Sequence, residues 1–349
     1  MKIDFPRYVP GVHFRSLAIL CASLLVTTAA ASAEVTWEPR TPADVKRSQV
    51  GVASDNERIY ALAGTMEVEG ADPQWASTLN MSYNPETDSW TELTPLPQPL
   101  THVGAAYLDG RIYAVGGFTN IIHMNPTNAA FVYDIATDTW FGIPAISHPR
   151  GSVSVVAAGG KIHAIAGRHS RETAELPLPF AETPMLQGIG TDSSHQIFDP
   201  ATGQWASAGN LPGPARDHLA AVELDGKIHV IGGRLDGYDE NVDRHDVYDP
   251  ATQLWAEAAP LPAPRSAGAA TVVDGKIIYA GGECGADNLA FADAYIYDAE
   301  SDEWTTVTSL PEARHGNGAA TVAGEAYFMA GGPQCGDSIS NEILAVSIE

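Results

Sequence analysis

Five arginines recur at one position of a repeating pattern in this sequence, and arginine is the side chain best suited to hold a carboxylate. Arg216 and Arg265 each end a loop that opens with Leu-Pro. The full set, here called the ring arginines, is Arg47, Arg150, Arg216, Arg265 and Arg314. A planar guanidinium can hold a carboxylate through two hydrogen bonds, which favours a sugar acid or an acidic peptide as ligand. The same arginines could instead pair with carboxylates or carbonyl groups of a neighbouring repeat, and the sequence leaves both interpretations open.

Further functional side chains occupy neighbouring positions of the same pattern. Three histidines lie close to the arginine position: His102, His218 and His315. Arg168, Arg234 and Glu283 begin the long loops that follow a pair of small residues. A carboxylate beside arginines could supply acid–base catalysis on a bound sugar. We therefore take all of these residues, together with the ring arginines, as candidate ligand-binding residues, and we assign no catalytic residue.

The sequence carries none of the common signatures of a resident cofactor. The CxxC pattern of zinc sites, HExxH, GxSxG and a glycine-rich phosphate loop do not occur. The acidic loop at residues 236–243 lacks the ligand spacing of an EF-hand and is better explained as a solvated loop. We therefore predict no metal and no cofactor.

Two sequence markers recur in step and divide the chain into six units. A pair of small residues occurs at Ala63-Gly64, Gly116-Gly117, Ala166-Gly167, Gly232-Gly233, Gly281-Gly282 and Gly331-Gly332. A tryptophan recurs at Trp37, Trp90, Trp140, Trp205, Trp255 and Trp304. Both series have a period of about 50 residues and contain one longer interval at the same place. The shared period indicates an array of similar structural units.

Each unit has the pattern of four short β-strands. In the fourth unit, residues 218–224 and 227–231 flank the hairpin turn Asp225-Gly226, and Tyr248 and Trp255 lie on the next two strands. One four-stranded sheet cannot bury its own faces, so such sheets stack radially. This predicts an all-β fold, a six-bladed β-propeller with four antiparallel strands per blade. The expected blades are residues 41–90, 91–140, 141–205, 206–255, 256–304 and 305–349.

The double glycine, the Tyr-Asp pair and the tryptophan at constant offsets resemble the kelch repeat, over almost all of the chain after residue 33. Units one and three depart from the pattern with Ala-Gly, and unit two has Leu100-Thr101-His102 where the others have arginine. Alternating turns place the arginine loops and the long loops on one face, which we call the loop face. The resemblance implies a module that binds a protein segment or an acidic glycan, and the ring arginines are expected around the mouth of the central channel on this face.

The first 33 residues are predicted to be a cleaved export signal. Basic residues up to Arg15 precede an apolar run at 16–28, and Ala31-Ser32-Ala33 fits a cleavage site. The propeller would then occupy residues 34–349. Its sixth unit ends after three strands, and the missing strand should carry a tryptophan. Residues 35–38, which include Trp37, are therefore expected to complete the last blade and close the ring.

Charge and cysteine content restrict the partners and the location. A net charge of −24 disfavours nucleic acid and anionic lipid. Residues 34–349 contain no apolar stretch of membrane-spanning length, so we expect no membrane contact after signal cleavage and a periplasmic or extracellular location. Cys284 and Cys335 occupy near-equivalent positions of adjacent units and are candidates for a disulfide, with two free thiols as the alternative.

Two classes of function fit these features, and binding is the first expectation. If the protein is an enzyme, two types of propeller enzyme are similar to it in layout. The sialic acid mutarotase type would use Glu283 and the arginines on the anomeric centre of a sugar acid, as a mutarotase or epimerase. The galactose-oxidase type of copper radical enzyme needs a Tyr–Cys crosslink, and is disfavoured because the cysteines look paired. The long loop of the third unit, residues 168–194, is the expected lid or specificity element.

Overall fold

The computed structural model describes residues 35–67, 75–120, 123–170, 189–237, 239–285, 288–336 and 338–348. Residues Ser32–Glu349 form one compact unit. The predicted export signal, residues 1–33, lies outside the described residues, as does most of the long loop of the third unit. Within the described ranges, no helix is long and apolar enough to cross a membrane.

The described strands form six four-stranded antiparallel sheets, which are the blades, and one small sheet of three strands. From the innermost strand outward, the first three blades are β3 (Gly51–Ser54), β4 (Ile59–Leu62), β7 (Asn80–Asn84) and β8 (Ser89–Glu92); β9 (Gly104–Leu108), β10 (Arg111–Val115), β11 (Ala130–Asp134) and β12 (Thr139–Ile143); β13 (Ser154–Ala158), β14 (Lys161–Ser170), β15 (Ile189–Asp199) and β16 (Gln204–Ser207).

Blades four and five repeat this order, and blade six takes its outermost strand from the start of the chain. These blades are β17 (Ala220–Leu224), β18 (Lys227–Ile231), β19 (His245–Asp249) and β20 (Leu254–Glu257); β21 (Ala269–Val273), β22 (Lys276–Ala280), β23 (Ala294–Asp298) and β24 (Glu303–Val307); β25 (Gly318–Val322), β26 (Glu325–Met329), β27 (Ile343–Ile348) and β1 (Val35–Pro39). The small sheet consists of β2 (Arg47–Ser48), β5 (Thr65–Met66) and β6 (Trp75–Ala76).

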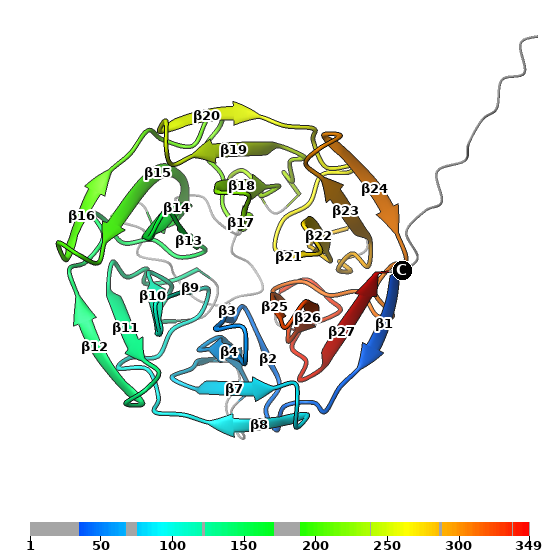
Figure 1. Cartoon of the computed structure of the whole chain (residues 1–349), viewed down its shortest axis with the longest axis horizontal. Helices are drawn as coiled ribbons and strands as arrows, with labels where there is room; N and C mark the ends of the chain where they lie inside the picture. Colours follow the sequence, from blue (N-terminus) through cyan, green and yellow to red (C-terminus); the bar gives the residue numbers. More distant parts are fainter. Residues whose placement is uncertain are drawn as a thin grey trace, which may run out of the picture. The chain divides into compact units, whose positions relative to one another are not determined.

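The blades stand in a ring with their first strands around the axis (Figure 1). β1 pairs with β27 in antiparallel register, from Val35 opposite Ile348 to Pro39 opposite Leu344. The predicted closure of the ring by the N-terminal strand is therefore confirmed, and blade six has no unpaired outer edge at β27. The all-β, six-bladed architecture predicted from the repeat is confirmed as well.

The recurring tryptophans lie on the outermost strands and connect neighbouring blades. In each blade, the indole Nε1 donates to a backbone carbonyl just after the outermost strand of the preceding blade, as Trp255 does to Gly209 at 2.9 Å and Trp37 to Thr308 at 2.9 Å. The same indole packs on an aromatic ring of its own blade, with Trp255 at 5.0 Å from Tyr248 between ring centroids. One side chain thus serves both the blade and its interface, which explains why the tryptophan recurs.

The hydrophobic core lies between the blades. Among the described residues, six buried clusters each combine side chains of two adjacent blades, as when Val156 and Ile165 of blade three pack with Ile228 and Tyr248 of blade four. Burial of these faces requires both partners, so each blade depends on its neighbours for stability.

The pair of small residues turns the chain after the second strand, and the structure corrects its position in blade six. Gly232 and Gly233 have φ values of 64° and 104°, in the left-handed region that glycine tolerates. In blade six, the pair with this conformation is Ala330 and Gly331, with φ of 58° and 80°. The sequence prediction of Gly331-Gly332 is therefore one residue late. Gly332 instead pairs with His315, as Glu283 pairs with Ser266 in blade five.

Candidate functional site

One residue from each blade surrounds the axis just before the innermost strand. This axial ring consists of Gln49, His102, Ser152, His218, Ala267 and Gly316, all with φ between 51° and 59°. Backbone hydrogen bonds pass from blade to blade through it, for example from His102 N to Gln49 O at 3.0 Å and from Ser152 N to His102 O at 3.0 Å. All six residues line a cavity of about 110 Å³, together with side chains such as Asn317. The axial ring therefore defines the mouth of the channel on the loop face.

The ring arginines do not line this cavity and are buried inside their own blades. Their exposed fractions range from 0 to 8%. Four pair with an acid at or just before the third strand: Arg150 with Asp192, Arg216 with Asp246, Arg265 with Asp293 and Arg314 with Glu342. Arg47 donates instead to the carbonyl oxygens of Ala61 and Ala63. These contacts hold the five arginines within the structure of their own blades. The contact with a ligand that the sequence predicted for them stays a prediction.

A second set of candidate residues meets around the carboxylate of Asp217, which contacts the axial-ring residue His218 but does not itself line the cavity. Arg168 Nε donates to Asp217 Oδ2, and Arg234 Nε donates to Asp217 Oδ1 at 3.3 Å. All three side chains are fully buried. Burial by itself would raise the pKa of Asp217, but His218, Arg234 and Arg168 lower it strongly overall. Asp217 is therefore an ionised anchor for two arginines that come from different blades.

Arg234 links this anchor to Glu283 of the next blade. Arg234 Nη1 donates to Glu283 Oε1 at 2.6 Å, and His315 Nε2 lies 3.4 Å from Glu283 Oε2. Against the effect of burial, the charge of Arg234 keeps the pKa of Glu283 below its usual value. Arg168, Asp217, Arg234, Glu283 and His315 therefore form a continuous network across blades three to six, which we call the mouth network.

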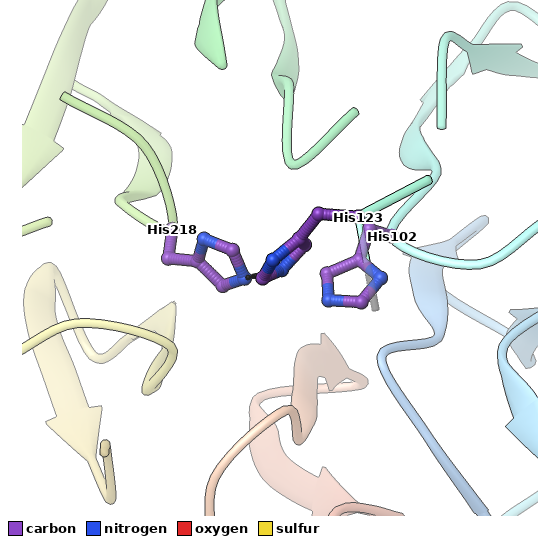
Figure 2. Close-up of side chains that lie close together, drawn as sticks. All are labelled: His102, His123 and His218. Atoms are coloured by element: carbon purple, nitrogen blue, oxygen red, sulfur yellow. Dashed lines mark hydrogen bonds between the residues drawn. The ribbon is translucent and has the colours of Figure 1, made fainter. Parts of the chain in front are cut away.

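Three histidines meet beside the mouth network, and we call them the histidine cluster. Figure 2 shows His102, His123 and His218 turned toward one another. Their ring centroids lie 4.8 to 5.1 Å apart. His123 Nε2 is 3.2 Å from His218 Nε2, and one ring nitrogen of each histidine lies within 4.8 Å of the others. Burial lowers the pKa of all three imidazoles, which favours their neutral form.

Two members of the site escaped the sequence analysis, Asp217 and His123. The sequence did contain a signal for Asp217. It lies at the repeat position between the ring arginine and the axial-ring residue, and this position is an acid only in unit four. The other units have Ser48, Thr101, Gly151, Ser266 and His315 there. His123 lies in the variable loop after Phe118, where the repeat gives no constant offset. Only the folded loop places it against His218.

The loops around the mouth include the two cysteines predicted to pair. Cys284 and Cys335 form a disulfide between blades five and six, with Cα atoms 5.7 Å apart. The insertion of the third unit begins and ends as strand, because β14 and β15 continue their pairing to Ser170 opposite Ile189. Residues 171–188, the centre of the expected lid, lie outside the described residues.

Sequence comparisons agree with this repeat architecture. A family model described as the KLHDC2/KLHL20/DRC7 Kelch-repeats domain matches residues 187–349, and the Kelch motif model matches residues 46–97 and 99–144. The chain belongs to the kelch-repeat family. Kelch propellers typically mediate protein interactions.

Individual kelch relatives are similar to this chain over part of their length. Kelch-like protein terF of Aspergillus terreus is 30% identical over 54% of this chain and 39% of its own length. Beta-scruin of Limulus polyphemus is 27% identical over 56% of this chain and 20% of its own length. The solved structure of YjhT has a TM-score of 0.70 at 18% identity and covers 89% of this chain and 99% of that chain. At this identity the likeness shows the fold alone.

Proposed function

We propose that this protein is an exported kelch propeller that binds a protein segment or an acidic glycan on its loop face, over the central cavity. The observation that supports the proposal is the gathering of buried polar groups, the mouth network and the histidine cluster, next to the axial ring, where His102 and His218 line the cavity. Buried polar groups cost free energy unless they are paired. Such a concentration of them at one mouth favours a binding site over a purely structural role.

The size of the cavity limits how a ligand could bind. A cavity of about 110 Å³ has room for one side chain or one sugar substituent. A ligand would therefore lie across the loop face and insert one group between polar residues such as Gln49, Ser152 and Asn317. Arg168 and Arg234 already hold the carboxylates of Asp217 and Glu283, the group that an acidic ligand would present.

A peptide and glycan array tests the proposal with variants of the axial ring. Gln49→Ala/Ser152→Ala removes two polar side chains that lie outside the charged network, and we expect it to weaken binding at least about 10-fold, equivalent to about 1.4 kcal/mol. Glu223→Ala, an exposed residue near the Asp-Gly turn at the other end of blade four, is the matched control. Binding that survives the axial variant unchanged would remove the mouth from the proposal.

The ring arginines need a separate arm of the same array. Arg216→Ala/Arg265→Ala should weaken binding only together with thermal stability, because both side chains are buried in ion pairs. Lost binding at an unchanged melting temperature would instead assign them a direct contact with the ligand.

Export is proposed on the sequence of residues 1–33 and on the disulfide, which is typical of oxidising compartments. The test is the mass of the protein recovered from fractionated cells. We expect a periplasmic or extracellular form that begins at Glu34, and a cytoplasmic form retaining residues 1–33 would contradict export.

One observation favours an enzyme as the second candidate. The ionised carboxylate of Glu283 lies 3.4 Å from His315 Nε2, a pair that could move a proton on a sugar-acid anomeric centre. Anomeric exchange of acidic sugars, followed by NMR, tests this. Exchange accelerated by the wild type and abolished in Glu283→Gln would support a mutarotase, and no acceleration would reject it.

A further inference from the structure

The histidine cluster has the spacing of ligands around one metal ion. A tetrahedral ion with metal–nitrogen bonds of about 2.0–2.1 Å separates its ligand nitrogens by about 3.3–3.4 Å. His123 Nε2 and His218 Nε2 are 3.2 Å apart, which matches the separation of two ligands of one ion. His102 offers its nitrogen within 4.8 Å of the other two. A small rotation of the His102 ring would complete a three-histidine site.

The second nitrogen of two of these rings already has a partner. His218 Nδ1 lies 3.1 Å from Asp217 Oδ1, which directs Nε2 toward His123. His102 Nδ1 lies 3.0 Å from the hydroxyl of Thr101. Histidines that bind metals usually donate their other ring N–H in this way, which fixes the tautomer and the ring orientation. Arg168 and Arg234 in turn hold Asp217 in place.

The formal charges around the histidine cluster balance one another. Two arginines, Arg168 and Arg234, are balanced by two carboxylates, Asp217 and Glu283, and burial favours the neutral form of the imidazoles. Arg234 Nη2 lies 3.2 Å from both ring nitrogens of His218 and 3.5 Å from His123 Nε2, so binding of a dication requires this guanidinium to move away from the two ligand nitrogens and favours an anionic fourth ligand such as hydroxide or a carboxylate. Both His102 and His218 line the central cavity, through which that ligand could enter.

We propose that His102, His123 and His218 bind one divalent metal ion of the zinc class, with the fourth coordination position facing the central cavity. Three imidazoles with an open position are the ligand set of catalytic rather than purely structural zinc sites. This proposal replaces the expectation of no metal drawn from the sequence motifs. It stands independently of which ligand the loop face binds.

The test is zinc binding by the full chain after removal of metals with EDTA. We expect one Zn²⁺ per chain by elemental analysis, and the absorption spectrum of a tetrahedral complex when Co²⁺ replaces Zn²⁺. His123→Ala and His102→Ala should each weaken Zn²⁺ affinity by more than the roughly 10–100-fold that loss of an orienting partner costs. Thr101→Val, which removes only the partner of His102 Nδ1, should weaken it about 10-fold.

A matched control is available in blade three, where His163 and His195 also face each other at 2.9 Å, with no third histidine grouped with them among the residues that the structure describes. His163→Ile/His195→Ala should leave the zinc stoichiometry and affinity unchanged. Circular dichroism and melting temperature exclude misfolding of the variants. The proposal is overturned if the wild type binds less than one Zn²⁺ per chain, if Co²⁺ gives no tetrahedral spectrum, or if folded His123→Ala retains full affinity. The first two outcomes need no variant.

Discussion

Two buried pairs of histidines should make this protein sensitive to mild acid. His163 Nδ1 lies 2.9 Å from His195 Nε2 in blade three, and His229 Nδ1 lies 2.8 Å from His245 Nε2 in blade four. All four side chains are buried. Each pair lies on the second and third strands, in the interface with the next blade. A proton added to either pair would place a charge in the core.

The magnitude follows from the pKa values in the folded and unfolded states. Burial lowers the pKa of His163 and His245 to about 4 and that of His195 and His229 to about 3. Unfolded histidine titrates near 6.5, so below this pH the unfolded chain binds protons that the folded chain does not. Each imidazole then costs up to about 1.4 kcal/mol of stability per pH unit between about 6.5 and 4. At pH 5 the four together cost up to about 8 kcal/mol, as much as the whole stability of many domains.

Blade five provides the substitutions for the test, because Ile278 and Ala294 occupy the same two positions there. We would measure urea unfolding at pH 7.5 and pH 5.0 for the wild type, His163→Ile/His195→Ala and His229→Ile/His245→Ala. Each double variant should lose about 4 kcal/mol less than the wild type between the two pH values. Ile278→Val, which disturbs the equivalent site without removing a titrating group, should behave like the wild type in pH dependence. Wild-type pH dependence in both double variants would refute the reasoning.

Three further predictions concern the architecture. Deleting residues 35–39 should lower the melting temperature strongly, and an unchanged melting temperature would contradict ring closure. Trp37→Ala alone should lower the free energy of unfolding by about 2–3 kcal/mol, because the indole loses its packing on Phe328. Replacing both cysteines of the disulfide by serine should cost roughly 4 kcal/mol, since the bridge spans 51 positions, and titration of the denatured, unreduced wild type should find no free thiol among the two. Arg216→Met should cost about 1–3 kcal/mol because it removes the buried partner of Asp246, which keeps only its ion pair with Arg244. Arg314→Met should cost less, because its partner Glu342 is half exposed, and equal losses in urea unfolding would argue against this account.

The fold could be predicted from the sequence because its signals are periodic. Six pairs of small residues and six tryptophans fix the number of blades, and Trp37 identifies the closing strand. The one register error, Gly331-Gly332 for Ala330-Gly331, arose because alanine also adopts the left-handed conformation at this turn. The sequence alone does not show that Ala330 takes the first position of the turn, because Gly331 is followed by a second glycine, Gly332.

The site was predictable only in part. Arg168, Arg234, Glu283, His218 and His315 meet because they occupy repeat positions that the ring geometry brings together. The direction of four of the five ring arginines depends on an acid near the third strand of the blade, such as Asp246, and the repeat pattern did not reveal this pairing. His123 comes from a loop of variable length, and its contact with His218 depends on the path of that loop in space.

The pairing of β1 with β27 also sets an order for folding. Trp37 bonds Thr308, which lies 271 positions further along the chain, so the first strand must wait for the last blade before it finds its place. A chain that emerges progressively from a ribosome or a membrane pore would hold an open, incomplete ring until its final residues appear. Completion of blade six then becomes the late step that makes the propeller stable, and a truncated or stalled chain would lack it.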